Sequence, residues 1–150
     1  MTTETTETDP RAAYAAFTAS LIEDFRANDG NVSEGPLAGR QIILLTTTGA
    51  KTGQPRTSPL VYSRDGADYI VVASKGGAPT HPAWYANLLA DPVVTAEVGR
   101  EIFRARAIAL TGGPERDRLY AQHAEVEAGF LEYPKKTDRV IPVIRLVRIG

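Results

Sequence analysis

The chain has no cysteine among its 150 residues and only two histidines, His81 and His123. The absence of cysteine excludes disulfide bonds, thiol nucleophiles and zinc sites built on thiolates. The two histidines lie far apart in the sequence, so we expect no catalytic metal. His81 precedes Pro82 at a predicted helix start and is expected to cap or pack there, whereas His123 is expected on a helix surface.

An excess of positive charge is also absent, because 17 basic residues face 18 acidic ones. A near-neutral chain has no broad positive field, so nucleic acid is not an expected partner. No apolar run approaches the length that spans a membrane, and the first residues show neither a basic nor an apolar signal region. These features favour a cytoplasmic protein, with peripheral contact at the inner face of the cell membrane left open.

Two segments rich in glycine and hydroxyl side chains stand out instead. They read TTTGAKTGQPRTSPL at 46–60 and ASKGGAPTHPAWYANL at 73–88, and they contain Lys51, Arg56 and Lys75. Glycine lets the backbone approach a ligand closely, and Lys and Arg donate charge-assisted hydrogen bonds to phosphate. We therefore predict an anion site, although each segment alone also fits a turn with solvated cations.

Familiar nucleotide motifs do not account for these segments. A Walker A motif requires glycines six residues before the lysine and directly before it, where this chain has Leu45 and Ala50, and no G-x-G-x-x-G occurs. Trp84 and Tyr85 follow the second segment at a predicted helix start. Adjacent helical positions face different directions, so one ring is expected in the core and the other beside a ring-shaped ligand.

The rest of the chain reads as an α+β fold. Residues 1–8 form a polar Thr/Glu tail that we expect to be disordered, and 9–150 a single domain. Mostly antiparallel strands with an N-terminal helix and two further helices favour a small barrel or curled sheet. The predicted helices cover 9–28, 82–89 and 113–128; the predicted strands are 41–48, a hairpin of 60–62 with 69–72, a hairpin of 93–98 with 101–110, and 140–149.

At these motifs the chain resembles a known family. The two segments above and TDRVIPVIRL at 137–146 match, in order and spacing, the deazaflavin-dependent nitroreductases, also described as deazaflavin-dependent quinone reductases of actinobacteria. The similarity extends from about Leu44 to Leu146. It implies a split β-barrel related to FMN-binding oxidoreductases. It also implies reduced coenzyme F420, an 8-hydroxy-5-deazaflavin with a phosphate and an oligoglutamate tail.

The resemblance also assigns residues. Lys51, Arg56 and Lys75 match the cations that contact the phosphate, and Trp84 and Asn87 match a helix beside the deazaflavin. Ala50 departs from the family, which often has a second basic residue there. The strand and loop positions that match the cofactor-lining segments are Thr52, Gly53, Pro59, Ala73, Ser74, Gly76 and Gly77.

Hydride transfer to a quinone, an enone or a nitroaromatic acceptor is the activity that the resemblance implies. Phe130 and Tyr133 lie in the loop expected to face the substrate, where some members have several tyrosines. Ser74 or Tyr133 would donate a hydrogen bond to the acceptor oxygen as negative charge develops there. The cofactor supplies the chemistry, so neither a metal nor a protein nucleophile is required.

Two other functions stay open from the sequence. A barrel of this kind would also hold deazaflavin or a lipid without turnover, and related barrels are FMN-dependent oxidoreductases. The N-terminal helix has aromatic residues on one face. We expect it to pack on the barrel rather than on a membrane, because its charged residues form no strongly basic face.

Overall fold

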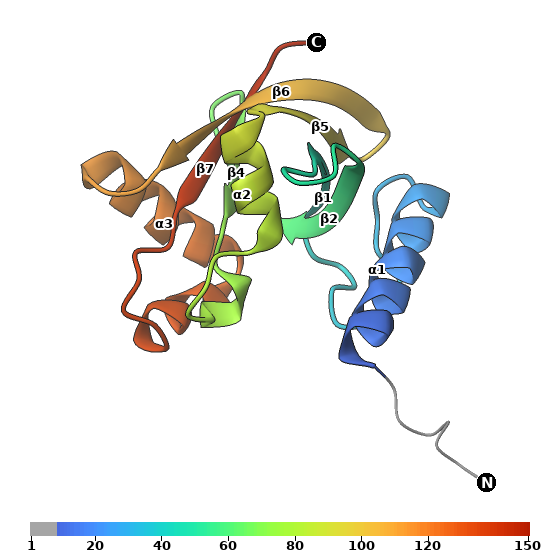
Figure 1. Cartoon of the computed structure of the whole chain (residues 1–150), viewed down its shortest axis with the longest axis horizontal. Coiled ribbons are helices and arrows are strands. Elements are labelled where there is room, and N and C mark those ends of the chain that lie inside the picture. The colour runs from blue at the N-terminus through green and yellow to red at the C-terminus, as the bar shows by residue number, and fades with distance from the viewer. Residues whose placement is uncertain (1–8) are drawn as a thin grey trace, which may run out of the picture.

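The fold consists of a curled sheet and three α-helices in residues 9–150, which this computed structural model describes (Figure 1). The tail predicted for residues 1–8 lies outside the described residues. The helices are α1 (Pro10–Ala27), α2 (Ala83–Ala90) and α3 (Pro114–Val126). The strands are β1 (Ile42–Thr48), β2 (Pro55–Val61), β3 (Ser63–Asp65), β4 (Asp68–Val72), β5 (Val93–Val98), β6 (Glu101–Leu110) and β7 (Val143–Arg148), and short 3-10 turns cover Lys75–Gly77, Ala128–Leu131 and Tyr133–Lys135.

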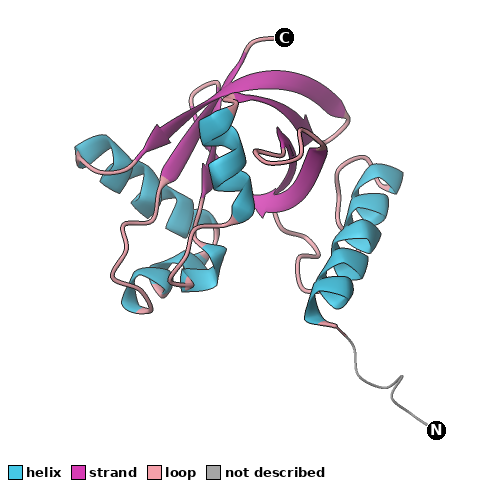
Figure 2. Cartoon of the chain, in the orientation of Figure 1, coloured by secondary structure: helices cyan, strands magenta, loops and turns pink. Residues whose placement is uncertain are grey.

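All seven strands form one antiparallel sheet in the order β2-β1-β5-β6-β7-β4-β3. The two edge strands, β2 and β3, are consecutive in the sequence, with only Tyr62 between them. The sheet must therefore curl until its two edges approach each other, which produces the half-barrel of Figure 2. This confirms the predicted α+β split barrel with an N-terminal helix and two further helices.

The predicted hairpin of 60–62 with 69–72 is wrong. Strand β2 pairs with β1, where Leu45 lies opposite Ser58, and only the short β3 pairs with β4, where Ser63 lies opposite Ile70. The N–H of Tyr62 still donates to Gln41 at the β1 edge, at 3.0 Å. One apolar run thus serves both edges of the sheet, and its periodicity does not show where the chain crosses between them.

Helix α3 packs on the sheet near β4 and buries a residue that we predicted at the surface. His123 is fully buried, because it lies one helical turn after Leu119 on the face that meets the sheet. Its Nδ1 lies 2.8 Å from the Ser63 hydroxyl, and its ring meets the Phe130 ring edge-on at 4.5 Å. Burial lowers the pKa of His123 to about 4, so the ring is neutral at neutral pH.

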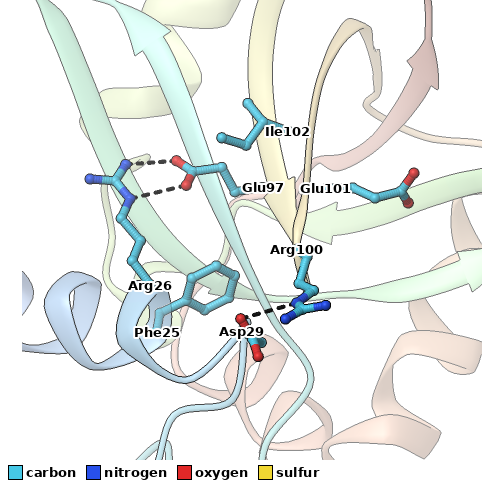
Figure 3. A pocket seen from close by; sticks show the side chains of 8 residues that line it. Phe25, Arg26, Asp29, Glu97, Arg100, Glu101 and Ile102 are labelled. Carbon is cyan, nitrogen blue, oxygen red and sulfur yellow. Dashed lines mark hydrogen bonds and ion pairs between the residues drawn. The ribbon is translucent and has the colours of Figure 1, made fainter.

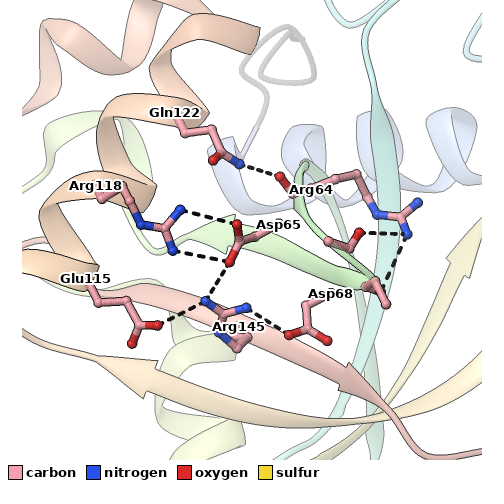
Figure 4. Close-up of polar contacts among 9 residues, drawn as sticks. Arg64, Asp65, Asp68, Glu115, Arg118, Gln122 and Arg145 are labelled. Carbon is pink, nitrogen blue, oxygen red and sulfur yellow. Dashed lines mark hydrogen bonds and ion pairs between the residues drawn. The ribbon is translucent and has the colours of Figure 1, made fainter.

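A network of arginines and carboxylates fastens the β3–β4 turn to β7 and α3 (Figure 4). Asp65 accepts hydrogen bonds from Arg118 and from Arg145. Arg145 also donates to Asp68 at 2.8 Å and to Glu115 at 3.1 Å. Hydrogen bonds from Arg118, and then from Arg145, lower the pKa of Asp65 to about 2.

Helix α1 lies on one side of the sheet and α3 on the opposite side, with α2 between them in the view of Figure 1. Only the second half of α1 is packed: Leu21 and Phe25 are buried, whereas Tyr14 and Phe17 are 58% and 43% exposed. The apolar stripe predicted along the whole helix is therefore buried over about two turns. No helix of the described residues is long and apolar enough to cross a membrane.

Candidate functional site

The first glycine-rich segment forms the tight turn between β1 and β2. The N–H of Gly49 donates to the carbonyl of Gln54 at 2.8 Å, and Gly53 has a φ of 71°, which favours glycine. Lys51 lies at the exposed tip of this turn, and Arg56 is exposed at the start of β2. The turn therefore places Lys51 and Arg56 next to the glycine backbone, which carries no side chain that would keep a ligand away.

Asn87 connects this turn to α2. Its Oδ1 accepts from the N–H of Ala50 at 2.9 Å, and its Nδ2 donates to the hydroxyl of Thr47 at 3.1 Å. The side chain is buried, so these bonds compete little with water. Trp84 lies one turn earlier on α2, and its placement therefore depends on the same connection.

The second glycine-rich segment forms a left-handed turn after β4. Lys75, Gly76 and Gly77 have φ angles of 48°, 64° and 84°, and the N–H of Gly77 closes the turn on the carbonyl of Ser74 at 2.9 Å. A Cβ on Gly77 would lie 3.0 Å from the Cβ of Lys136, so glycine is needed there for space as well as for conformation.

The three predicted cations are not neutralised by the protein. Among residues 9–150, no acidic group pairs with Lys51, Arg56 or Lys75. The Nζ of Lys75 reaches only the hydroxyl of Thr80, at 3.2 Å. Their positive charge is available to an anionic ligand.

Two cavities lie beside these turns and share a wall. The first, of about 630 Å³, is the cationic cavity, with Lys51, Thr52 and Arg56 on one side and α2 on the other. The second, of about 700 Å³, is the apolar cavity, lined largely by aliphatic and aromatic groups together with Ser74 and Lys75. The residues common to both are Ser58, Ala83 and Trp84. The arrangement is one groove with a charged end and an apolar end.

The structure brings most of the predicted site residues to this groove. Lys51, Thr52, Arg56 and Asn87 line the cationic cavity, Trp84 lines both, and Pro59, Ser74, Lys75, Gly76 and Phe130 line the apolar cavity. Four others line neither: Gly53, Ala73, Gly77 and Tyr133. Ala73 is fully buried, and the ring of Tyr133 packs on the ring of Phe130 at 5.1 Å.

Both aromatic residues at the start of α2 are buried, although we expected only one in the core. Tyr85 is 6% exposed and stacks near His81 at 4.8 Å, and Trp84 is 7% exposed while still lining both cavities. Trp84 is therefore the ring that borders the ligand space.

A further cavity of about 440 Å³ lies between the end of α1 and the β5–β6 turn (Figure 3). Its charged side chains are all paired: Arg26 binds Glu97 with two hydrogen bonds of 2.7 and 3.0 Å, Arg100 pairs with Asp29 at 3.2 Å, and Glu101 pairs with Arg148 at 3.1 Å. The first two pairs fasten α1 to the sheet, and all three leave little charge for a ligand. The glycine-rich groove is the stronger candidate site.

Sequence reasoning missed Arg139, which lies within the third motif quoted above. Its guanidinium donates to the backbone carbonyls of Ala73, Ser74 and Ala78 around the left-handed turn. An arginine directly before an apolar strand was the only sequence signal, and it does not reveal contacts with a turn some sixty residues earlier.

Comparison with known proteins identifies the family. Residues 20–147 match the family described as "F420H(2)-dependent quinone reductase". The chain belongs to this family. A protein of Mycobacterium tuberculosis that is named an F420-dependent quinone reductase is 41% identical over 126 residues, which is 83% of this chain and 85% of that protein.

Solved structures agree with this family and with the fold. A structure titled as an F420-H2 dependent reductase is 42% identical, with a TM-score of 0.66 over 71% of this chain and 94% of that one. Another, titled as a domain-swapped dimer, is 36% identical, with a TM-score of 0.68 over 91% and 98% of the two chains. This family member is an oxidoreductase, and its cofactor is coenzyme F420.

The groove fits this cofactor chemically. Coenzyme F420 is anionic through its phosphate and glutamate groups, and Lys51, Arg56 and Lys75 are cations that pair with no acidic group in the described part of the chain. Its ring system is flat and largely apolar, and Trp84 stands where the charged and apolar cavities meet. Neither cavity lining contains an acidic side chain that would repel the phosphate.

Proposed function

We propose that the groove binds reduced coenzyme F420 and a quinone together, and that a hydride passes from the coenzyme to the quinone. The observation that carries this proposal is the wall shared by a cationic cavity and an apolar one at Ser58, Ala83 and Trp84. Such a wall lets an anionic cofactor extend along the groove from Lys51 and Arg56 towards Lys75, while the apolar cavity also admits the acceptor.

Lys51, Arg56 and Lys75 would hold the anionic groups of the cofactor. A hydrogen bond to a charged partner typically contributes about 1.5–3 kcal/mol, and binding would break no ion pair between these cations and another of residues 9–150. Thr52 and Gly76 lie on the same turns and would line the cofactor, and Gly53 and Gly77 would act by keeping those turns open.

Trp84 and Pro59 would line the ring, and the surrounding apolar groups would exclude water from it. When bound, the coenzyme supplies the hydride; the residues of the chain orient it and shield it. Ala73 is buried behind Ser74 and would support the lining rather than touch the ligand.

Ser74 would donate a hydrogen bond to the acceptor oxygen as negative charge develops there. It lines the apolar cavity, and no side chain among residues 9–150 occupies its hydroxyl. Phe130 would contact the acceptor from the same cavity. Tyr133 is proposed for the same donation, but its ring would have to leave Phe130 to reach the cavity.

Enones and nitroaromatics are proposed as further acceptors, since each combines an electrophilic π system with an oxygen that gains charge. Quinones dissolved in a membrane would be reached through the exposed Tyr14 and Phe17, because Tyr14 also lines the apolar cavity. Sedimentation with quinone-loaded anionic vesicles tests this contact: Tyr14→Ser with Phe17→Ser should reduce it, and equal sedimentation would reject it.

The central activity is tested by following the absorbance of reduced coenzyme F420 with menadione under anaerobic conditions. The proposal expects saturable oxidation that depends on both compounds. Cyclohexenone and a nitroimidazole should then be compared at equal concentrations. A protein that binds the coenzyme but oxidises it no faster than buffer with all three acceptors would instead be a binding protein.

A further inference from the structure

Arg139 makes four contacts from the loop before β7 to the segment that follows β4. Its Nε donates to the carbonyl of Ala78 at 2.9 Å, its Nη2 to Ser74 at 2.7 Å, and its Nη1 to Ala73 at 3.3 Å. The same Nη1 lies 2.9 Å from Nδ1 of His81. A single guanidinium thus gathers both ends of the left-handed turn and the entry to α2.

The turn that Arg139 encloses has a conformation that needs outside support. Lys75 has a φ of 48°, a left-handed conformation that is strained for a residue with a side chain and persists only when the surroundings hold it. The two backbone bonds across the turn, from Gly77 to Ser74 and from Ala78 to Lys75, do not by themselves fix its orientation relative to the sheet. Arg139 fixes that orientation, because its planar fork reaches carbonyls on both sides.

The contact with His81 extends the effect to α2. Arginine has no acceptor atom, so the guanidinium donates this hydrogen bond and Nδ1 of His81 accepts it. His81 directly precedes Pro82, from which α2 and Trp84 follow. The guanidinium therefore links the turn that carries Lys75 to the helix that carries Trp84.

We propose that Arg139 is a positioning residue for the cofactor groove, acting through the turn that carries Lys75 and through the start of α2. The proposal rests on the proposed function. Arg139 lines neither cavity, so it does not bind the ligand itself. Lysine cannot replace it, since a single ammonium cannot reach carbonyls on both sides of the turn in the fixed geometry of a guanidinium.

Arg116 provides a matched control. Its guanidinium also donates twice to one backbone carbonyl, that of Ile141, at 3.1 and 2.8 Å, but it lies away from both cavities. We expect Arg139→Lys to weaken F420 binding by about 10- to 100-fold, and Arg116→Lys to change it by less than about twofold, at similar losses of melting temperature.

Coupling to Lys75 separates positioning from general destabilisation. If Arg139 acts through Lys75, the double variant Arg139→Lys with Lys75→Ala loses less affinity than the sum of the two single losses. Fully additive losses, or an Arg139→Lys variant that binds as well as wild type, would overturn the proposal. Arg139→Gln, whose side-chain amide offers two N–H donors, serves as the second variant if Arg139→Lys does not fold.

Hydrogen exchange on the cofactor-free protein tests the same inference without ligand. The amides of Gly77 and Ala78 should exchange about tenfold faster in Arg139→Lys, with β1 amides unchanged, and at the wild-type rate in Arg116→Lys. Failure of the wild-type protein to bind F420 would reject the proposed function alone. Unchanged exchange at Gly77 and Ala78 would reject the role of Arg139, whatever the protein binds.

Discussion

The Asn87 side chain accepts a 2.9 Å hydrogen bond from the N–H of Ala50, and its amide nitrogen donates to Thr47 at 3.1 Å. Both polar ends of this buried amide are therefore occupied by the protein, on the strand and turn that face α2. The resemblance implied that Asn87 flanks the cofactor, and it does line the cationic cavity. Its geometry indicates that it also sets the distance between Lys51 and Trp84.

Replacing Asn87 should affect both stability and binding. Asn87→Ala leaves the buried Thr47 hydroxyl and the N–H of Ala50 without their partner, and loss of a buried hydrogen-bond partner typically costs about 1–3 kcal/mol of unfolding free energy. Asn87→Asp keeps the acceptor for Ala50 but adds negative charge to the cationic cavity, so it should weaken F420 binding more than Asn87→Ala does. Urea unfolding and cofactor titration measure the two effects, and the reverse order of affinities would contradict this role.

Removing one of the three cations should weaken binding of the cofactor without unfolding the protein. Lys51→Ala, Arg56→Ala and Lys75→Ala should each reduce F420 affinity by about 10- to 100-fold, since each removes one charge-assisted contact worth about 1.5–3 kcal/mol. Arg104→Ala is the control, because Arg104 is exposed, has no ion pair among the described residues and lines neither cavity of the groove. Equal affinity in a folded Arg56→Ala, Lys75→Ala double variant would exclude the anion site.

The hydrogen bond to the acceptor oxygen should come mainly from the hydroxyl of Ser74. Ser74→Ala is expected to lower turnover by about tenfold to a thousandfold, as loss of a donor to developing charge does elsewhere. Its cofactor affinity should change by less than about twofold, because that donation is made in the transition state. Tyr133→Phe, which removes only a hydroxyl, tests the second predicted donor: a comparable fall would show that Tyr133 leaves Phe130 during turnover, and an unchanged rate would leave it structural.

The buried His123 should make stability depend on pH. Its folded-state pKa of about 4 lies below the ordinary 6.5, so as pH falls below about 6.5 only the unfolded chain takes up the proton. The free energy of unfolding should decrease by up to roughly 3 kcal/mol between about pH 6.5 and 4, with no contribution from this group at higher pH. Unfolding by urea should be measured at pH 7 and at pH 5. Both values lie above the pH range in which Asp65, whose pKa is about 2, titrates.

Two variants separate this effect from simple destabilisation. His123→Gln removes the titrating ring and should flatten the change between pH 7 and pH 5. Leu119→Val loosens the same buried face of α3 but keeps the ring, so it should lower stability equally at both pH values. An unchanged slope in His123→Gln would mean that another group causes the pH dependence.

The sequence predicted the elements and the chemistry better than it predicted their contacts. Apolar runs and glycine turns located β1, β4, β5, β6 and β7, and the two clusters that contain Lys51 and Lys75 meet at one groove. The pairing of β2 was mispredicted, because a single apolar run feeds both edges of the curled sheet. His123 was misplaced because Gln122 and Glu125 near it in the sequence are polar, whereas Leu119 and Tyr120, one helical turn before it, lie in the core.

Other contacts were invisible because they depend on tertiary structure. Arg139 lies some sixty residues from the carbonyls that it binds, and Asn87 lies 40 residues from Thr47. No spacing rule connects such positions, and only the closed fold brings them together. For Tyr133 the sequence located the loop between α3 and β7 but not the direction of the side chain, which depends on packing against Phe130.

Direct comparison of reduced coenzyme F420 with FMN tests most closely whether the groove is a deazaflavin site. Trp84 is the single tryptophan of the chain and lines both cavities, so its fluorescence reports occupation of the groove. We predict that reduced coenzyme F420 binds at least about tenfold more tightly than FMN, a difference of roughly 1.4 kcal/mol, and that Arg56→Ala removes most of this preference. Equal or tighter binding of FMN, with turnover on FMN, would contradict this prediction.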